Sequence, residues 1–211
     1  MDYEALANAV IKGNVDLAKE ETQKAFDAGN DPQHILDKGL IAAMDVVGEK
    51  FAKGAMFVPQ MLRSAKTMQA CVALLKPNFQ NGVMTTKGKV ILGTVKGDLH
   101  DIGKNLVAMM LEGAGFQIVD LGVDVTPEAF VQSVSQEKGQ ILGMSALLST
   151  TMPAMAETMK ALENAGQRKE VIIMIGGAPV TAEFADQIGA DCYAPDAGTA
   201  VAEAKRRLNV A

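Results

Sequence analysis

The sequence is poor in cysteine, in aromatic residues and in clusters of basic residues. Of its 211 residues, two are cysteine, none is tryptophan and only 4% are aromatic. Cys71 and Cys192 are far apart and form no CxxC pair, so we expect two buried, reduced thiols in a cytoplasmic protein rather than a disulfide framework. The net charge is −5 without a basic block, which argues against nucleic acid as the main partner.

Long apolar runs and an apolar signal segment are also missing. The N-terminus, residues 1–4, is acidic, and no later run is long enough to span a bilayer, so we expect no membrane partner. Hydrophobic residues nevertheless make up 48% of the chain, which is enough to build a packed core. Thirteen methionines and few aromatic residues predict an aliphatic, adaptable interior.

The first 77 residues carry apolar side chains at helical spacing. Two helices are predicted over residues 4–12 and 15–28, a third over 31–54 and a fourth over 59–76. The third begins at Asp-Pro, which suits an N-cap followed by the first helical residue. Four helices with short joins predict a small bundle. Residues 77–88 are rich in Asn, Gly and Thr, as is typical of a linker.

From residue 89 onward, predicted strands alternate with predicted helices. The strands span 90–95, 116–121, 141–144, 171–175 and 192–193, and the helices span 104–113, 127–138, 153–165, 182–188 and 198–208. Five βα units predict a doubly wound, five-stranded parallel sheet in the flavodoxin-like, Rossmann-type order. We therefore divide the chain into a helical cap domain with its linker, residues 1–88, and an α/β domain, residues 89–211.

Small, polar and flexible residues follow three of the predicted strands. They are residues 97–103 after the first strand, 145–151 at the end of the third and 176–178 after the fourth. In a doubly wound sheet, ligands bind beyond the carboxyl ends of the strands, at the switch point that the first and third strands flank. We therefore expect these three segments to converge on one binding edge.

Several phosphate-binding motifs can be excluded at this edge. Residues 97–104 resemble a P-loop, but one residue too many separates the two glycines, and Asn105 stands where Ser or Thr is required. No GxGxxG follows the first strand, which argues against a dinucleotide fold. Asp98 could be the acceptor of a phospho-receiver domain, but such a domain has a lysine after its fifth strand, where this chain has Ala-Pro-Asp at 194–196.

One histidine in this region needs an explanation. Asp98 precedes His100 by two residues and is placed to accept its second ring N–H, which fixes the tautomer and raises the basicity of a ligating histidine. No Cys/His cluster supplies the remaining ligands of a zinc or iron site, whereas a metal already held in a macrocycle needs only one protein ligand. The other histidine, His34, lies in a predicted amphipathic helix near Asp31 and Asp37, and we interpret it as structural.

At these residues the sequence resembles the cobalamin-binding family. The signature of that family is Asp-x-His-x-x-Gly, then Ser-x-Leu, then Gly-Gly, and the matching segments here are 98–103, 145–147 and 176–177, each at a predicted strand end. Residues 48–61 resemble the helical cap of cobalamin-dependent methionine synthase, and resemble still more the stand-alone corrinoid proteins of three-component methyltransferase systems. Together the two modules cover nearly the whole chain.

The resemblance implies that cobalamin binds base-off and His-on. The dimethylbenzimidazole tail leaves the cobalt and enters a slot beside the first, third and fourth strands, and His100 becomes the lower axial ligand. Asp98 hydrogen-bonds His100, and the hydroxyl of Thr151 completes a proton relay, in which methionine synthase has serine. The other residues that the resemblance implies in cofactor binding are Gly103, Ser145, Leu147, Ser149, Gly176, Gly177 and Ala197. The two adjacent glycines lack side chains, so the tail can approach the backbone closely.

The resemblance also assigns three residues of the cap. Phe51, Val58 and Met61 match positions that cover the upper face of the cobalt and its methyl group, although methionine synthase has leucine where this chain has Val58. Apolar residues at this spacing are equally what the core of a helical bundle requires.

The function that the resemblance implies is that of a methyl carrier without catalysis of its own. Cob(I)alamin receives a methyl group from a substrate-specific methyltransferase, and methylcobalamin passes it to a second methyltransferase that acts on tetrahydrofolate or on a thiol. A corrinoid reductive activase is a further implied partner. The protein supplies ligation, shielding and docking, and we see no catalytic base or substrate pocket in the sequence. The methyl donor stays open, since methanol, methylamines, quaternary amines and methoxylated aromatics are served by similar carriers.

Two other functions use a similar cofactor-binding fold. A cobalamin-dependent sensor would add a DNA-binding helical domain before the cap, whereas here the cap begins at the first residues without a basic helix. The small subunit of an adenosylcobalamin mutase lacks a helical cap, so residues 1–77 count against it.

Overall fold

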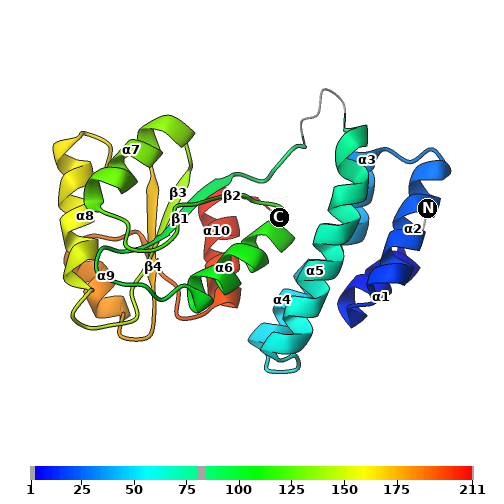
Figure 1. Cartoon of the computed structure of the whole chain (residues 1–211), viewed down its shortest axis with the longest axis horizontal. Coiled ribbons are helices and arrows are strands. Elements are labelled where there is room, and N and C mark those ends of the chain that lie inside the picture. Colours follow the sequence, from blue (N-terminus) through cyan, green and yellow to red (C-terminus); the bar gives the residue numbers. More distant parts are fainter. Residues whose placement is uncertain (1–2, 80–83, 211) are drawn as a thin grey trace. The chain divides into compact units, whose positions relative to one another are not determined.

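The computed structural model describes residues 3–79 and 84–210, and it divides the chain into two units (Figure 1). The helical unit comprises residues 1–86 with 112–115, and the sheet unit comprises residues 87–111 and 116–211. Residues 80–83, in the middle of the predicted linker, lie outside the described residues. Within the described ranges, no helix is both long enough and apolar enough to cross a membrane.

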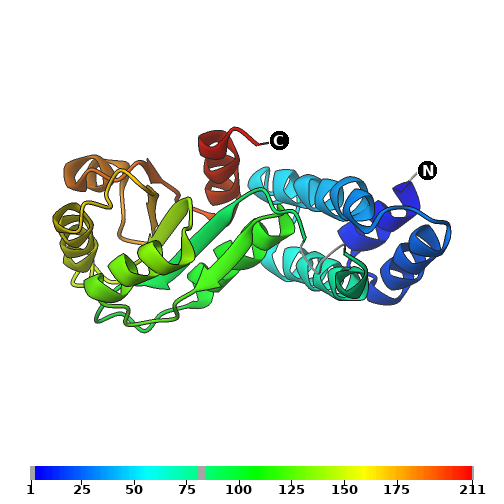
Figure 2. The same ribbon diagram turned by 90° about the horizontal axis from the view of Figure 1, so that it is seen from above.

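The helical unit is a bundle of the predicted kind (Figure 2). Helix α1 packs against α2, α4 and α5, and α2 packs against α5. The segments are α1 (Glu4–Lys12), α2 (Val15–Asp27), α3 (Pro32–Ile35), the π-helical turn η1 (Leu36–Ile41), α4 (Ala42–Ala52), α5 (Val58–Leu75) and the 3-10 turn η2 (Lys76–Asn78).

The third predicted helix begins as expected but contains an irregular turn. The Asp31 carboxylate accepts the N–H of His34 at 3.0 Å, and Pro32 is the first helical residue, as predicted. The hydrogen bonds then slip to the π-helical pattern in η1, which the apolar spacing did not reveal. Within this turn, a Cβ at Gly39 would lie 2.7 Å from Leu6 Cδ2, so a side chain there would collide with α1.

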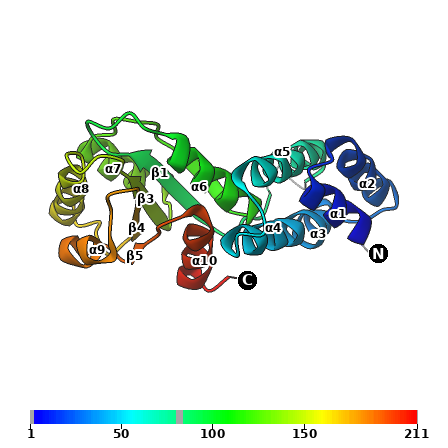
Figure 3. The same ribbon diagram turned by 90° about the horizontal axis from the view of Figure 1, so that it is seen from below.

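The sheet unit contains five parallel strands in the order β2-β1-β3-β4-β5, which is the predicted flavodoxin-like order. Helices α6 and α10 cover one face of the sheet, and α7, α8 and α9 cover the other (Figure 3). The strands are β1 (Lys89–Thr94), β2 (Gln117–Asp120), β3 (Ile141–Ser145), β4 (Ile172–Gly176) and β5 (Cys192–Tyr193), and the helices are α6 (Ile102–Gly113), α7 (Pro127–Glu137), α8 (Pro153–Asn164), α9 (Ala182–Ile188) and α10 (Ala197–Leu208).

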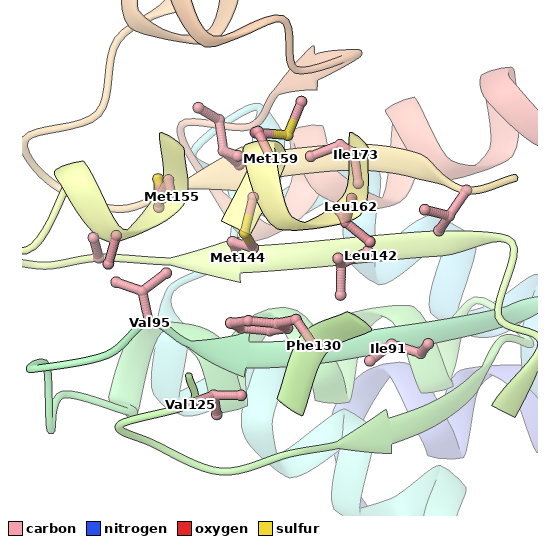
Figure 4. Close-up of a cluster of buried hydrophobic side chains, with 14 of the residues drawn as sticks. Ile91, Val95, Val125, Phe130, Leu142, Met144, Met155, Met159, Leu162 and Ile173 are labelled. Atoms are coloured by element: carbon pink, nitrogen blue, oxygen red, sulfur yellow. The ribbon is translucent and has the colours of Figure 1, made fainter. Parts of the chain in front are cut away.

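Among the buried residues of the core cluster between the sheet and helices α7 and α8, Phe130 is the one aromatic residue, and the others are aliphatic or methionine (Figure 4). Phe130 of α7 is fully buried against β1, where a Cβ at Gly93 would come within 2.6 Å of its ring. Met144, Met155 and Met159 belong to the same buried cluster. Cys71 and Cys192 are buried and unpaired, as predicted. This packing fixes the central strands, and with them the edge at which the candidate residues lie.

Candidate functional site

The carboxyl ends of β1, β3 and β4 lie level with one another. Thr94 pairs with Ser145, and Ser145 pairs with Gly176, so the three strands end side by side. Strands β1 and β3 are neighbours in the sheet. The connection that follows β1 leads to β2 on one side, and the connection that follows β3 leads to β4 on the other side. The three segments that the sequence analysis singled out therefore leave the sheet at one edge, at its switch point.

Asp98 and His100 form the predicted hydrogen-bonded couple at this edge. Nδ1 of His100 lies 2.7 Å from Asp98 Oδ1, and the backbone N–H of His100 donates to the same oxygen at 3.0 Å. Because an ionised carboxylate can only accept, Nδ1 carries the hydrogen of this contact, and Nε2 is the ring nitrogen that takes no part in it. Asp98 is 0% exposed, whereas half of the His100 side chain is exposed. The couple thus joins a buried acceptor to a ring at the surface.

The second oxygen of Asp98 is held by the loop after β3. Oδ2 accepts the N–H of Leu147 at 2.7 Å and lies 2.8 Å from the hydroxyl oxygen of Thr151. Burial by itself raises the pKa of Asp98, but the hydrogen bonds from Leu147, from the ring and the N–H of His100, and from Thr151 outweigh burial and hold the pKa well below its ordinary value. Asp98 is therefore ionised at neutral pH.

The Nε2 atom of His100 is available to an external partner. In the described part of the chain, no residue donates a hydrogen bond to this atom. Within residues 3–79 and 84–210 there is also no group of three or more His, Cys, Asp or Glu side chains that could hold a metal ion. A single oriented imidazole fits a metal that arrives inside a macrocycle with its equatorial positions already filled.

The surroundings of His100 fit a large apolar ligand. Leu99 and Ile102, on either side of it in sequence, are 72% and 86% exposed. The other exposed large apolar residues that the structure describes in the sheet unit are Val123, Leu147 and Leu148, which follow β2 and β3 at the same edge. Exposed apolar side chains gathered around one polar group are typical of a binding surface.

Gly103 gives a second indication that this edge fits a large bound ligand. It lies in the first turn of α6 without a positive φ, and a Cβ built there would meet no heavy atom within 4 Å. Alanine would stabilise a helix at such a position. The fold therefore does not require glycine at this residue, and open space beside His100 is what a close-lying cofactor needs.

At Gly176 and Gly177, unlike at Gly103, the fold itself requires glycine. A Cβ at Gly176 would lie 2.6 Å from the carbonyl oxygen of Ala194, and one at Gly177 would lie 1.9 Å from that of Ala146. Gly177 also has a φ of +125°, which other residues rarely adopt. The close approach that excludes side chains here is therefore that of neighbouring strand ends, and the approach of the cofactor tail stays a prediction.

The remaining predicted residues of the sheet unit lie at the ends of its elements. Ser145 is the last residue of β3, Leu147 and Ser149 are exposed in the loop that follows, and Ala197 is buried at the first turn of α10. In the helical unit, Phe51 lies in α4, Val58 begins α5 with a partly exposed side chain, and Met61 is fully buried. Their roles toward a cofactor stay predictions.

Four supporting residues could not be predicted from the sequence. The hydroxyl of Thr94 donates to the carbonyl oxygen of His100 at 2.9 Å. Asp124 contacts the backbone of residues 97–98, and the buried Lys104 forms an ion pair with Asp120. Lysine is rarely buried unless it is paired, but the burial of Lys104 is visible only in the structure, so the sequence offered no signal for this ion pair.

Comparisons with known proteins identify both units. A family model described as "B12 binding domain" matches residues 88–205, and a second model with the same description matches residues 3–76. Trimethylamine corrinoid protein 2 of Methanosarcina mazei is 43% identical over 205 residues, covering 96% of this chain and 94% of the relative. Dimethylamine corrinoid protein 1 of Methanosarcina acetivorans is 43% identical over 204 residues, covering 96% and 95%.

A solved structure agrees with these matches. A chain of the methanol:cobalamin methyltransferase complex MtaBC from Methanosarcina barkeri superposes with a TM-score of 0.90 at 33% identity, covering 98% of this chain and 79% of that one. The matched descriptions, the sheet topology and the chemistry at the sheet edge point in the same direction. The chain belongs to the B12-binding family of corrinoid proteins, and cobalamin is its cofactor.

Proposed function

We propose that this chain is the methyl carrier of a methyltransferase system. It binds cobalamin base-off and His-on, with His100 as the lower axial ligand, and has no catalytic activity by itself. The names of its relatives, which are corrinoid proteins for trimethylamine and dimethylamine, support a methylamine as the methyl donor. The likeness to a chain of a methanol:cobalamin methyltransferase complex supports a methyltransferase as its partner.

The observation that carries this proposal is the orientation of His100. Its ring is held through Nδ1 by a buried carboxylate, while Nε2 forms no hydrogen bond with any described residue. Such a ring offers one neutral nitrogen donor in a fixed tautomer, which is what an axial ligand must supply. The exposed apolar side chains beside it provide the contact area for a flat, largely apolar ring.

The bound cofactor supplies the methyl-transfer chemistry, since its cobalt can accept and release a methyl group. The residues around His100 serve both its ligated and its unligated state. Asp98 holds the His100 ring through Nδ1 and leaves Nε2 for the cobalt. Thr151 Oγ1 lies 2.8 Å from both Asp98 Oδ2 and the carbonyl oxygen of Leu148, so its single hydrogen can turn from one to the other as the charge of the couple changes.

The other predicted residues complete the proposed site. Residues at the ends of β3 and β4 and at the start of α10 border the displaced tail, namely Ser145, Leu147, Ser149, Gly176, Gly177 and Ala197. In the helical unit, Phe51, Val58 and Met61 shield the upper face of the cobalt. The further partners are a second methyltransferase, acting on tetrahydrofolate or a thiol, and a reductive activase.

The test has two steps. Apo-protein mixed with hydroxocobalamin should retain about one corrinoid per chain through gel filtration, with the spectrum of a displaced tail. After reduction, the holoprotein should be methylated by dimethylamine or trimethylamine only when a matching methyltransferase is added. A holoprotein that demethylates dimethylamine or trimethylamine without any added methyltransferase would contradict the carrier role. Retained corrinoid without methylation by any amine methyltransferase, combined with light-dependent DNA binding, would replace the carrier by a sensor.

A further inference from the structure

A residue outside the matched motifs holds the backbone that carries the Asp98–His100 couple. Asp124 lies in the loop between β2 and α7. Its N–H donates to the carbonyl oxygen of Asp98 at 3.0 Å, and its Oδ1 accepts the N–H of Gly97 at 2.7 Å. These two hydrogen bonds hold the N–H that precedes the Cα of Gly97 and the carbonyl group that follows the Cα of Asp98. Together they set the direction in which the Asp98 side chain leaves the backbone.

The Asp98 end of this segment is also held through its side chain, by Leu147 and Thr151, but the Gly97 end is not. Residues 95–98 form a turn closed by the Asp98 N–H and the Val95 carbonyl oxygen, with Gly97 at its third position and a φ of +82°. Glycine permits this geometry but does not enforce it. The acceptor on the Gly97 N–H therefore adds a restraint at the one position of the turn where glycine leaves the backbone free.

Asp124 itself adopts an uncommon conformation, with a φ of +54°. The other described non-glycine residues with positive φ are Lys138 and Asn209, and both are helix C-caps, where the left-handed conformation is ordinary. Asp124 ends no helix, so its conformation is maintained by the contacts around it.

The loop that carries Asp124 is anchored to the central strand of the sheet. The N–H of Thr94 donates to Gly122 at 3.0 Å, and the N–H of Val125 donates back to Thr94 at 2.9 Å. Val125 also forms a parallel bridge with Val95, and the two side chains lie close together in the core (Figure 4). The support therefore runs from the sheet through Asp124 to the turn that precedes His100.

We propose that Asp124 is a positioning residue for the axial ligand. By fixing the backbone at Gly97 and Asp98, it directs Asp98 Oδ1 to the His100 ring and keeps Nε2 pointed at the cofactor. It touches neither His100 nor any atom assigned to the cofactor. This inference rests on the proposed role of His100.

Two substitutions separate the side chain of Asp124 from its backbone conformation. Asp124→Gly permits the positive φ but removes Oδ1, and Asp124→Asn keeps both an acceptor at Oδ1 and a preference for the left-handed region. In the apo-protein, hydrogen exchange at the Gly97 amide should become faster in Asp124→Gly and stay near the wild-type rate in Asp124→Asn. Unchanged exchange in the glycine variant would overturn the proposal.

The holoprotein supplies the readout that a purely structural role would not change. In the cobalt(II) form, the strength of axial histidine ligation, read from the electron paramagnetic resonance spectrum, should weaken by about tenfold in Asp124→Gly. Corrinoid retention should be unaffected, and Asp124→Asn should restore ligation. Wild-type ligation in the glycine variant would overturn the positioning role. If the wild-type spectrum shows no histidine ligand at all, the proposed function fails instead, and the hydrogen-exchange result remains separate from it.

Discussion

The hydroxyl oxygen of Thr151 lies 2.8 Å from Asp98 Oδ2, on the carboxylate oxygen that does not face His100. Thr151 and Asp98 are both buried, so the contact is shielded from water. A residue in the loop after β3 thereby supports the carboxylate that orients a histidine in the loop after β1. The couple is completed only when both loops are folded.

Thr151→Val should destabilise the apo-protein, because it removes a hydrogen bond to a buried carboxylate at nearly constant volume. We expect the free energy of unfolding to fall by about 1–2 kcal/mol in urea titrations. Thr151→Ser keeps the hydroxyl and should retain most of the stability. A valine variant as stable as wild type would mean that the hydroxyl does not support Asp98.

Asp98 should contribute stability that depends on pH in a specific direction. Its pKa is lowered in the folded state, so its contribution is fully present above the ordinary carboxyl pKa of about 4 and is lost as the pH falls below that value. At neutral pH, Asp98→Asn should cost about 2 kcal/mol.

The measurement is the difference in unfolding free energy between wild type and Asp98→Asn in the apo-protein at several pH values. Other carboxylates titrate in both proteins and cancel. The difference should shrink as the pH falls below about 4. A difference that grows below that pH would contradict the lowered pKa.

Gly103→Ala should act in opposite directions on the apo-protein and on cofactor binding. A Cβ at this helical position meets no atom of the chain, so the apo-protein should become more stable by about 0.5 kcal/mol. The same methyl group would project into the space that we assign to the cofactor, so the affinity for hydroxocobalamin should fall. Unchanged affinity together with increased stability would show that the cofactor does not approach Gly103.

The ion pair between Lys104 and Asp120 should be asymmetric. Nζ lies 2.6 and 2.5 Å from the two carboxylate oxygens, but the Lys104 side chain is 3% exposed and that of Asp120 is 40% exposed. Asp120→Asn leaves a buried cation in the first turn of a helix, where the helix dipole also disfavours it, and should cost about 2–3 kcal/mol. Lys104→Met leaves an anion that water can reach, and should cost about 1 kcal/mol or less.

Urea unfolding of both single variants and of the double variant tests this asymmetry. The double variant should be more stable than Asp120→Asn alone, since it removes the uncompensated cation. Equal losses in the two single variants would mean that the burial of Lys104 does not decide its energetics.

Much of this architecture could be predicted from the sequence, since the strands and helices follow from apolar periodicity and turn residues. The couple of Asp98 and His100 could be predicted because its members are two residues apart. Thr151 is 53 residues from Asp98 and was found only through the resemblance, as no local rule joins them.

The features that were missed depend on backbone geometry. The π-helical turn at residues 36–41 changes the hydrogen-bond pattern without changing the apolar face, so the sequence does not mark it. Asp124 acts through a left-handed φ and through backbone groups of Gly97 and Asp98, which any residues would supply. The close approach at Gly177 involves Ala146, which only the fold brings near it.

The central claim is that His100 binds the cobalt in place of the cofactor's own tail. The chain has two histidines, His34 and His100, so labelling histidine with nitrogen-15 marks both, and a His34→Gln variant leaves the label at His100 alone. The labelled protein is loaded with unlabelled cobalamin and reduced to cobalt(II), and the splitting of its electron paramagnetic resonance lines by the axial nitrogen is recorded. We predict doublets from nitrogen-15 in both wild type and His34→Gln, and their loss in His100→Ala with corrinoid retained. Triplets from nitrogen-14 in the labelled wild-type protein would mean that the tail still holds the cobalt, and would contradict the account.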